Sequence, residues 1–72
     1  MTNEFLLNKK IAEVGKKKRY LAEKCGMTYA CFYNCIKNKA HFNAEHIAIL
    51  CVELKIKSLK EKEDIFFSKQ GV

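Results

Sequence analysis

Proline and tryptophan are absent from this 72-residue chain, and glycine occurs only three times. Turn-dense β folds use proline and glycine at many positions, so their scarcity argues against an all-β domain. No apolar run approaches the roughly 18 residues that span a bilayer, and the first residues lack the basic and apolar stretches of a signal peptide. These absences predict a cytoplasmic protein that makes no contact with a membrane.

The length of the chain limits what it can do. A protein of this size buries only roughly 60% of the surface that its unfolded chain exposes, which leaves no room for a second core or a deep enzyme cleft. Hydrophobic residues make up 49% of the chain and charged residues 31%, which is a globular rather than a disordered composition. We therefore predict one domain over residues 1–67 and a frayed C-terminal tail over residues 68–72.

Acidic residues are in the minority, since 14 Lys and Arg against 8 Asp and Glu give a formal net charge of +6. Four of the basic residues are consecutive, and we call them the basic run: Lys16, Lys17, Lys18 and Arg19. A predicted helix begins within this run, where each positive charge in the first turn opposes the helix dipole by about 0.3–1 kcal/mol. Either an anionic partner relieves this cost, or the run is a solvated loop that keeps the protein soluble.

Apolar residues at helical spacing predict an all-α fold, a compact domain of five helices. Gly15 and Gly26 can take the positive φ of the turns that end the first and second helices. The predicted helices cover residues 4–14, the stretch from the basic run to Gly26, residues 29–37, a stretch after Asn43 and a short stretch after Ser58. The predicted core is Leu7, Ile11, Val14, Leu21, Ala22, Cys25, Phe32, Cys35, Ile36, Ile47, Leu50, Cys51, Leu54, Leu59, Ile65 and Phe66.

Polar side chains mark where three of these helices begin. Thr28 and Asn43 can each cap a helix through a side-chain oxygen, and Ser58 with Glu61 has the spacing of a capping box. The short stretch from residue 38 to residue 41 is then a polar connection between the third and fourth helices.

Three apolar or aromatic side chains have two open interpretations. Ile49 and Val52 lie opposite the core face of the fourth helix, so they either pack against the fifth helix, which we favour, or form an association surface. Tyr33 either lies against a neighbouring helix with its hydroxyl in water or stays on the surface.

Cysteine and histidine do not predict a metal site. The four cysteines, Cys25, Cys31, Cys35 and Cys51, would suggest disulfides in a secreted protein, but here we interpret them as reduced thiols. Three of them, Cys25, Cys35 and Cys51, fall at predicted core positions. A zinc site from Cys31 and Cys35 with Cys25 or His41 is the alternative, and its spacing matches known ligand patterns poorly. We predict His41 in a loop, His46 facing solvent on a helix, and no metal or cofactor.

The middle of the chain has the residue order of a helix-turn-helix. Leu21-Ala22 places a small residue where two helices cross, Gly26-Met27-Thr28 supplies a turn, and Phe32 and Cys35 anchor the second helix. With the features that follow, the chain resembles the Cro/XRE-type helix-turn-helix regulators of temperate phages of Gram-positive bacteria over roughly residues 4–67. More narrowly, its size and layout resemble the modulator-of-repression proteins, the anti-repressor partners of lysogeny repressors in lactococcal phage switches. The later features are Lys37-Asn38-Lys39, Phe42 to Ile47, Leu54-Lys55-Ile56 and Ile65-Phe66-Phe67.

The resemblance implies a fold of the lambda-repressor-like type and two groups of contact residues. The first group meets a phosphate backbone or an acidic surface and consists of the basic run and Lys39. The second group is the outward face of the recognition helix and consists of Thr28, Tyr29, Ala30, Tyr33, Asn34 and Lys37.

The recognition face departs from what base reading needs. Direct readout of base edges relies on Arg, Lys, Gln, Asn or Ser, and of these types the face offers only Asn34 and Lys37, with the hydroxyl of Thr28 beside them. Tyr29 and Tyr33, four residues apart, instead form an aromatic surface of the kind enriched at protein interface hot spots. The face is therefore more typical of docking than of base reading.

Two functions follow from these observations. The first is an anti-repressor that covers the DNA-reading surface of the phage lysogeny repressor in the bacterial cytoplasm, with operator DNA as a further partner. The alternative is a Cro-like repressor that binds operator DNA directly as a dimer. The chain has no phosphate loop, no nucleophile–base arrangement and no paired carboxylates on an apolar face, so we expect neither an enzyme nor a small-molecule substrate.

Overall fold

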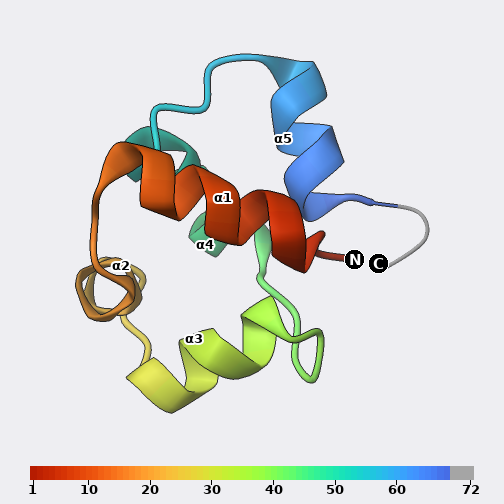
Figure 1. The fold of residues 1–72 in the computed structure, drawn as a ribbon. Helices are drawn as coiled ribbons and strands as arrows, with labels where there is room; N and C mark the ends of the chain where they lie inside the picture. Colours follow the sequence, from red (N-terminus) through yellow and green to blue (C-terminus); the bar gives the residue numbers. More distant parts are fainter. Residues whose placement is uncertain (69–72) are drawn as a thin grey trace.

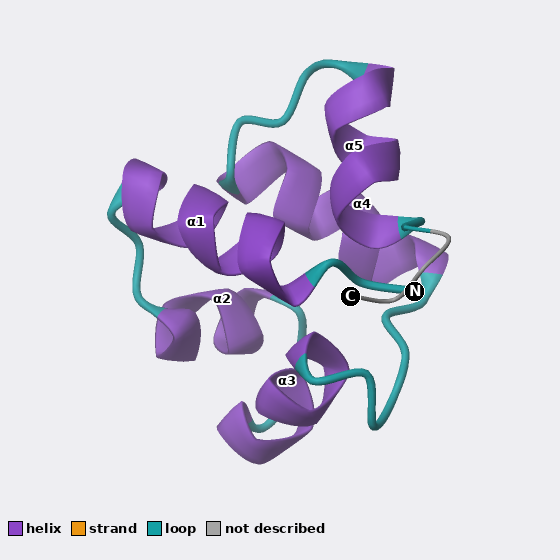
Figure 2. Ribbon diagram, turned by 45° about the vertical axis from the view of Figure 1, so that its right-hand side comes forward, coloured by secondary structure: helices purple, strands orange, loops and turns teal. Residues whose placement is uncertain are grey.

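Residues 1–68 are described by the computed structural model, and they contain five helices and no strand (Figure 1). The prediction of an all-α, five-helix domain is confirmed. Helix α2 packs on α3 and also contacts α4, while α1 packs on α5. In both views α2 and α3 lie together at one end of the molecule, away from α5 (Figure 2). The helices are α1 Glu4–Val14, α2 Lys18–Lys24, α3 Tyr29–Ile36, α4 Ala44–Glu53 and α5 Leu59–Phe66.

Four of the five helices begin at a side-chain cap. The predicted caps Thr28, Asn43 and Ser58 each accept a hydrogen bond from a backbone N–H three residues later, and Asn3 does the same for α1. The capping box predicted at Ser58 is only half present, because the Glu61 carboxylate pairs with Lys10 of α1 rather than returning to its own helix. Lys17, which precedes α2, makes no side-chain cap.

Turns and core follow the predicted pattern closely. Gly15 and Gly26 have φ of 80° and 72°, as their turns require. Phe32, Leu7, Leu21 and Leu50 are completely buried, so the centre of the domain is built from α1 to α4. Phe42 lies edge-on between Phe32 and Phe66, with ring centroids 5.7 and 5.9 Å apart, and thereby links α3 to α5. Leu54, Ile56, Ile47, Ile11, Ala22, Cys25, Cys35, Ile36 and Ile65 are also buried, whereas Val14 and Cys51 are half-buried.

Three predictions about side chains are wrong. Leu59 is 68% exposed, because it is the first residue of α5 and lies about 10 Å along the helix from Phe66, where α5 meets the core. Val52 is 76% exposed on the outer side of α4, whereas Ile49 on the same helix is half-buried against the core. His46 is half-buried rather than solvent-facing, since its Nδ1 accepts from the Asn43 N–H and completes a capping box.

The N-terminal arm is fixed to the rest of the domain by backbone hydrogen bonds. The Asn3 N–H donates to the Ile65 carbonyl at 2.7 Å, and Thr2 is buried. Met1 and Ser68 exchange two backbone hydrogen bonds of 2.9 and 3.1 Å, so the tail predicted to fray from residue 68 is anchored at its first residue. The rest of that predicted tail, residues 69–72, lies outside the described residues.

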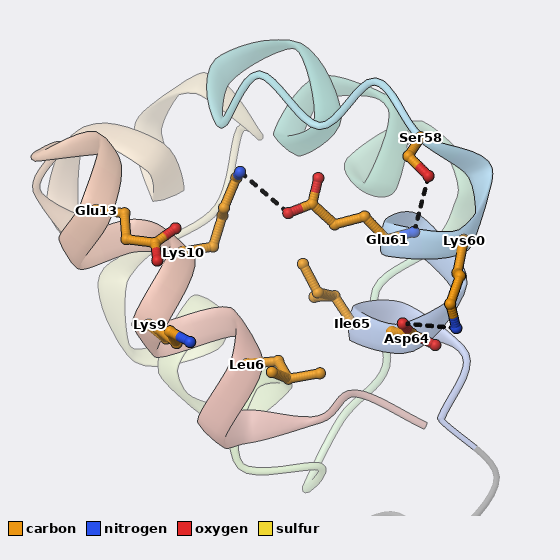
Figure 3. A pocket seen from close by; sticks show the side chains of 9 residues that line it. All are labelled: Leu6, Lys9, Lys10, Glu13, Ser58, Lys60, Glu61, Asp64 and Ile65. Atoms are coloured by element: carbon orange, nitrogen blue, oxygen red, sulfur yellow. Dashed lines mark hydrogen bonds and ion pairs between the residues drawn. The ribbon is translucent and has the colours of Figure 1, made fainter.

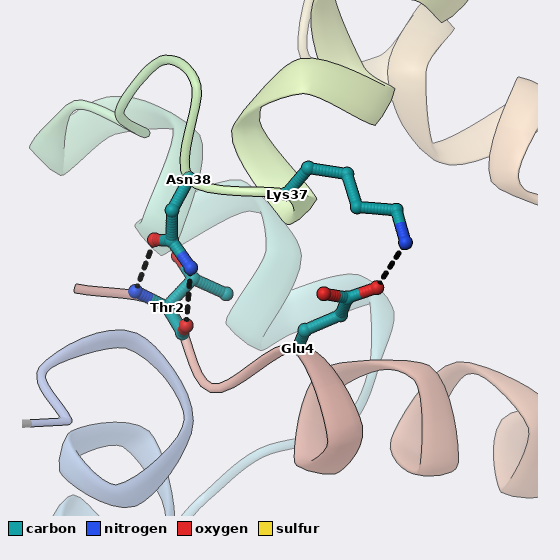
Figure 4. A network of polar contacts seen from close by, with 4 residues as sticks. All are labelled: Thr2, Glu4, Lys37 and Asn38. Atoms are coloured by element: carbon teal, nitrogen blue, oxygen red, sulfur yellow. Dashed lines mark hydrogen bonds and ion pairs between the residues drawn. The ribbon is translucent and has the colours of Figure 1, made fainter. Parts of the chain in front are cut away.

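The loop after α3 holds this arm through a single side chain. Asn38 accepts from the Thr2 N–H and donates to the Thr2 carbonyl, both at 2.9 Å (Figure 4). Its backbone has φ of 65°, a left-handed conformation that asparagine tolerates better than most residues. The C-terminal end of α3 is therefore tied to the start of α1.

Candidate functional site

The outer side of α3 is exposed along its whole length. Phe32, Cys35 and Ile36 face the core, and the helical period then directs the remaining side chains away from it. Every position predicted for the recognition face is exposed: Thr28, Tyr29, Ala30, Tyr33, Asn34 and Lys37. The structure therefore brings the predicted recognition residues together on one surface, although the Thr28 hydroxyl is also used as the helix cap.

Two tyrosines dominate this surface. Tyr29 and Tyr33 are 41% and 42% exposed, so Tyr33 remains on the surface rather than packing against a neighbouring helix. Their rings are stacked, with centroids 6.5 Å apart and planes inclined by 28°. The aromatic surface expected from their i, i+4 spacing is present.

A cation lies against each of these two rings. The guanidinium carbon of Arg19, in α2, is 5.3 Å from the centre of the Tyr29 ring, and Lys37 Nζ is 5.5 Å from that of Tyr33. Both distances are within the range of cation–π attraction. The rings are thereby held between α2 and the end of α3.

Lys37 is fixed further by α1. Its ammonium group donates to the Glu4 carboxylate, which reaches across from the first turn of α1 (Figure 4). This hydrogen bond, and then the charge of Glu4, raises the pKa of Lys37 above its usual value. Among the predicted recognition residues, Lys37 is thus the one whose charged side chain already forms an ion pair, with Glu4.

The basic run divides into two parts. Lys16 turns toward α4, where its Nζ lies 2.7 Å from a carboxylate oxygen of Glu53; this hydrogen bond raises the pKa of Lys16 and lowers that of Glu53. Lys17 and Lys18 stand at the start of α2, where the helix has no side-chain cap and no acidic residue in its first turn. Lys39 is exposed in the loop after α3.

Tyr20 belongs to this surface and was missed in the sequence. It is 40% exposed on α2, and its ring lies between Lys16 and Lys24, whose ammonium nitrogens are 5.4 and 5.5 Å from its centre. Lys16 precedes α2 and reaches the ring from the turn, whereas Tyr20 and Lys24 have the i, i+4 spacing that places both on one side of the helix. That spacing was the available signal.

A shallow groove of about 380 Å³ lies between α2 and the start of α3, beside Tyr20 and Tyr29. Arg19 and Tyr20 line one part of it and Tyr29 another, so the groove joins the aromatic residues of both helices. Its remaining lining residues are Ala22, Glu23 and Met27.

A second groove, of about 370 Å³, separates α1 from α5 (Figure 3). Its charged groups are largely paired with one another, since Lys10 meets Glu61 at 3.0 Å and Lys60 meets Asp64 at 3.5 Å. Lys10 and Glu61 join α1 to α5, whereas Lys60 and Asp64 pair within α5, and both pairs neutralise their own charges and leave little net charge for a ligand. The groove between α2 and α3 is the better candidate site.

Cysteine and histidine do not form a metal site in the described part of the chain, where no three His, Cys, Asp or Glu side chains lie close enough to share an ion. Cys25 and Cys35 are buried, and burial raises the pKa of both thiols. Cys31 is exposed, and His41 is exposed in the loop before α4.

Comparisons with protein-family models, with curated proteins and with solved structures found no match to this chain. Within residues 1–68, no helix has both the length and the apolar character needed to cross a membrane. The functional interpretation therefore depends on the surface of α2 and α3.

Proposed function

We propose that this chain is a helix-turn-helix regulator of a phage genetic switch and acts as an anti-repressor. In this function α3 and the basic run cover the DNA-reading surface of the lysogeny repressor, in the N-terminal helix-turn-helix domain of that protein. Binding turns the repressor off or holds both proteins in a joint complex on DNA. The protein acts in the cytoplasm of the bacterial host and has no enzymatic activity.

The observation that carries this proposal is the exposed pair Tyr29 and Tyr33. On a DNA-reading helix these central positions would supply donors and acceptors to base edges. Tyrosine offers a large, rigid apolar area with one polar tip, which suits the centre of a protein interface. Arg19 and the exposed lysines around the pair then steer the approach of acidic groups on the partner.

The test is complex formation with the DNA-binding domain of the repressor. Mixed at micromolar concentration, the two proteins should elute together from a size-exclusion column. Tyr29→Ala should raise the dissociation constant about 30-fold, which corresponds to a hot spot of about 2 kcal/mol. Phe5→Ala is the matched control, because Phe5 is an exposed aromatic residue of α1, and it should leave the affinity unchanged. Two independent peaks would contradict the proposal.

A Cro-like repressor that binds operator DNA directly is the second candidate. The observation that favours it is the start of α2, where Lys17 and Lys18 stand without a cap and can meet a phosphate backbone, while Asn34 on α3 is exposed. A dimer would then place two copies of α3 on half-sites one helical turn apart. A gel shift at about 50 mM salt tests this function, and binding without sequence preference would exclude it.

A further inference from the structure

All three tyrosines of the chain lie on the surface, and each has a cation beside its ring. We call Tyr20, Tyr29 and Tyr33 the tyrosine strip. The distances from ring centre to cation fall between 5.3 and 5.5 Å, for Lys16 and Lys24 at Tyr20, Arg19 at Tyr29 and Lys37 at Tyr33. Rings and positive charges therefore alternate across the surface of α2 and α3.

The strip is continuous from α2 to α3. Tyr20 and Tyr29 line the same groove, and Tyr29 is stacked with Tyr33. The centres of these two rings are 6.5 Å apart and their planes are inclined by 28°, so they form one aromatic surface on α3. Tyr29 and Tyr33 are 41% and 42% exposed, so each offers part of its ring to a base.

We propose that the tyrosine strip binds single-stranded nucleic acid. Bases would stack on the tyrosine rings, and the phosphates that join them would meet the cations between the rings, as in other proteins that bind single strands. A duplex cannot bind this surface in the same way, because its bases are stacked on one another and only their edges are accessible in the grooves. An arginine of a protein partner could also stack on these rings, but it would approach two like charges, Arg19 and Lys37.

Two of the four cations are available for phosphates. Arg19 and Lys24 form no ion pair with any carboxylate among residues 1–68, whereas Lys16 and Lys37 are held by Glu53 and Glu4. The paired cations keep Tyr20 and Tyr33 in place, and the unpaired ones add to the formal net charge of +6 that attracts a polyanion.

Intrinsic fluorescence provides a direct measurement, because the chain has no tryptophan and its only tyrosines are those of the strip. The full chain is titrated with oligothymidylate of about 12 nucleotides, and separately with its duplex with oligoadenylate, at about 50 mM salt. We expect the single strand to quench the tyrosine emission and to bind at least fivefold more tightly than the duplex.

Variants separate stacking from charge, with affinities measured by the anisotropy of a labelled oligonucleotide. Tyr29→Leu and Tyr33→Leu should each weaken single-strand binding by about fivefold or more and leave duplex binding unchanged. Arg19→Gln should reduce the salt dependence of single-strand binding. Phe5→Leu, in an exposed aromatic residue of α1, is the matched control, and circular dichroism verifies that each variant is folded.

Two outcomes would overturn this inference. In the first, the tyrosine variants bind the single strand as well as the wild type does, so that charge alone accounts for binding. In the second, no nucleic acid quenches the tyrosines, yet the same variants disrupt the complex with the repressor; the strip then belongs to a protein partner and the anti-repressor function stands. Single-strand binding in a protein that forms no repressor complex would instead support this inference and remove that function.

Discussion

Asn38 and Lys55 share a left-handed backbone conformation but differ in what their side chains do. Their φ values are 65° and 58°, a region that costs most L-residues about 1–2 kcal/mol. Asn38 offsets this cost with two side-chain hydrogen bonds to Thr2, whereas the side chain of Lys55 is exposed. The Asn38 side chain thus stabilises the fold, whereas the Lys55 side chain makes no hydrogen bond within residues 1–68 that would offset its backbone strain.

Replacing each residue with glycine should therefore have opposite effects on stability. Lys55→Gly removes the strain and should raise the free energy of unfolding by up to about 1 kcal/mol, after the added entropy of the unfolded chain is subtracted. Asn38→Gly loses both hydrogen bonds and should lower it by about 1–3 kcal/mol. Urea denaturation measures both, and a loss of stability in Lys55→Gly would show that its side chain has a role.

The pair Lys16–Glu53 makes stability depend on pH. Because the hydrogen bond from Lys16 holds the pKa of Glu53 below its ordinary value, the folded protein favours the ionised carboxylate. The stabilisation is complete at pH values above the ordinary pKa of the unfolded chain, 4.5, and is lost as the pH falls through the lower pKa of the folded state.

Urea unfolding from pH 7 down to about pH 3 tests this dependence. Glu53→Gln should be less stable than the wild type at neutral pH, and the difference should disappear in acid. Glu63→Gln is the control, since Glu63 is an exposed carboxylate of α5 that makes no ion pair among residues 1–68. A difference between wild type and Glu53→Gln that persists at the acid limit would contradict the assignment.

At the scale of the element, α2 differs from the other four helices. It is seven residues long, it begins without a side-chain cap, and lysine and arginine occupy its first turn. The missing cap and the positive charges both destabilise the start of α2, whereas each of the other four helices begins at a side-chain cap. These features fit the proposed function, in which an anionic partner meets the start of α2.

Lys17→Asp tests this interpretation by separating stability from binding. The new carboxylate can cap α2 and match its dipole, so the free energy of unfolding should rise by about 1 kcal/mol. Binding to an anionic partner should weaken at the same time, because a positive charge is replaced by a negative one. Thr28→Ala is the reference, since it removes an existing cap and should lower stability by about 1 kcal/mol. Unchanged binding in Lys17→Asp would contradict the interpretation.

The elements that could be predicted from the sequence are those whose signals are local. The bounds of α1 and the caps Thr28 and Asn43 follow from apolar period, glycine position and side-chain oxygens, all within a few residues of one another. Leu59 was misplaced because its exposure depends on how far α5 extends beyond α1, which no local pattern encodes. The pairing of Glu61 with Lys10 rather than with its own helix has the same origin, since those residues are 51 positions apart.

On the scale of the whole molecule, the candidate site is at one end, where α2 and α3 meet, and the paired charges of the α1–α5 groove are elsewhere (Figures 2 and 3). The exposure of Tyr29 and Tyr33 could be predicted from α3 alone. The cations beside their rings could not, because Arg19 comes from α2 and Lys37 is oriented by Glu4 of α1. The packing of separate helices assembles this surface, and only the fold brings its parts together.

The two backbone hydrogen bonds between residues 1 and 68 make the path of the chain nearly a closed ring. A peptide that leads from residue 68 back to residue 1 has little distance to cover, so circularisation would restrict the unfolded chain far more than the folded one. New ends could then open in the exposed stretch around residues 57 and 58, between α4 and α5, without interrupting a helix. In such a permuted protein the helices would follow one another in a different order along the chain but keep the same arrangement in space. The surface of α2 and α3 would stay intact.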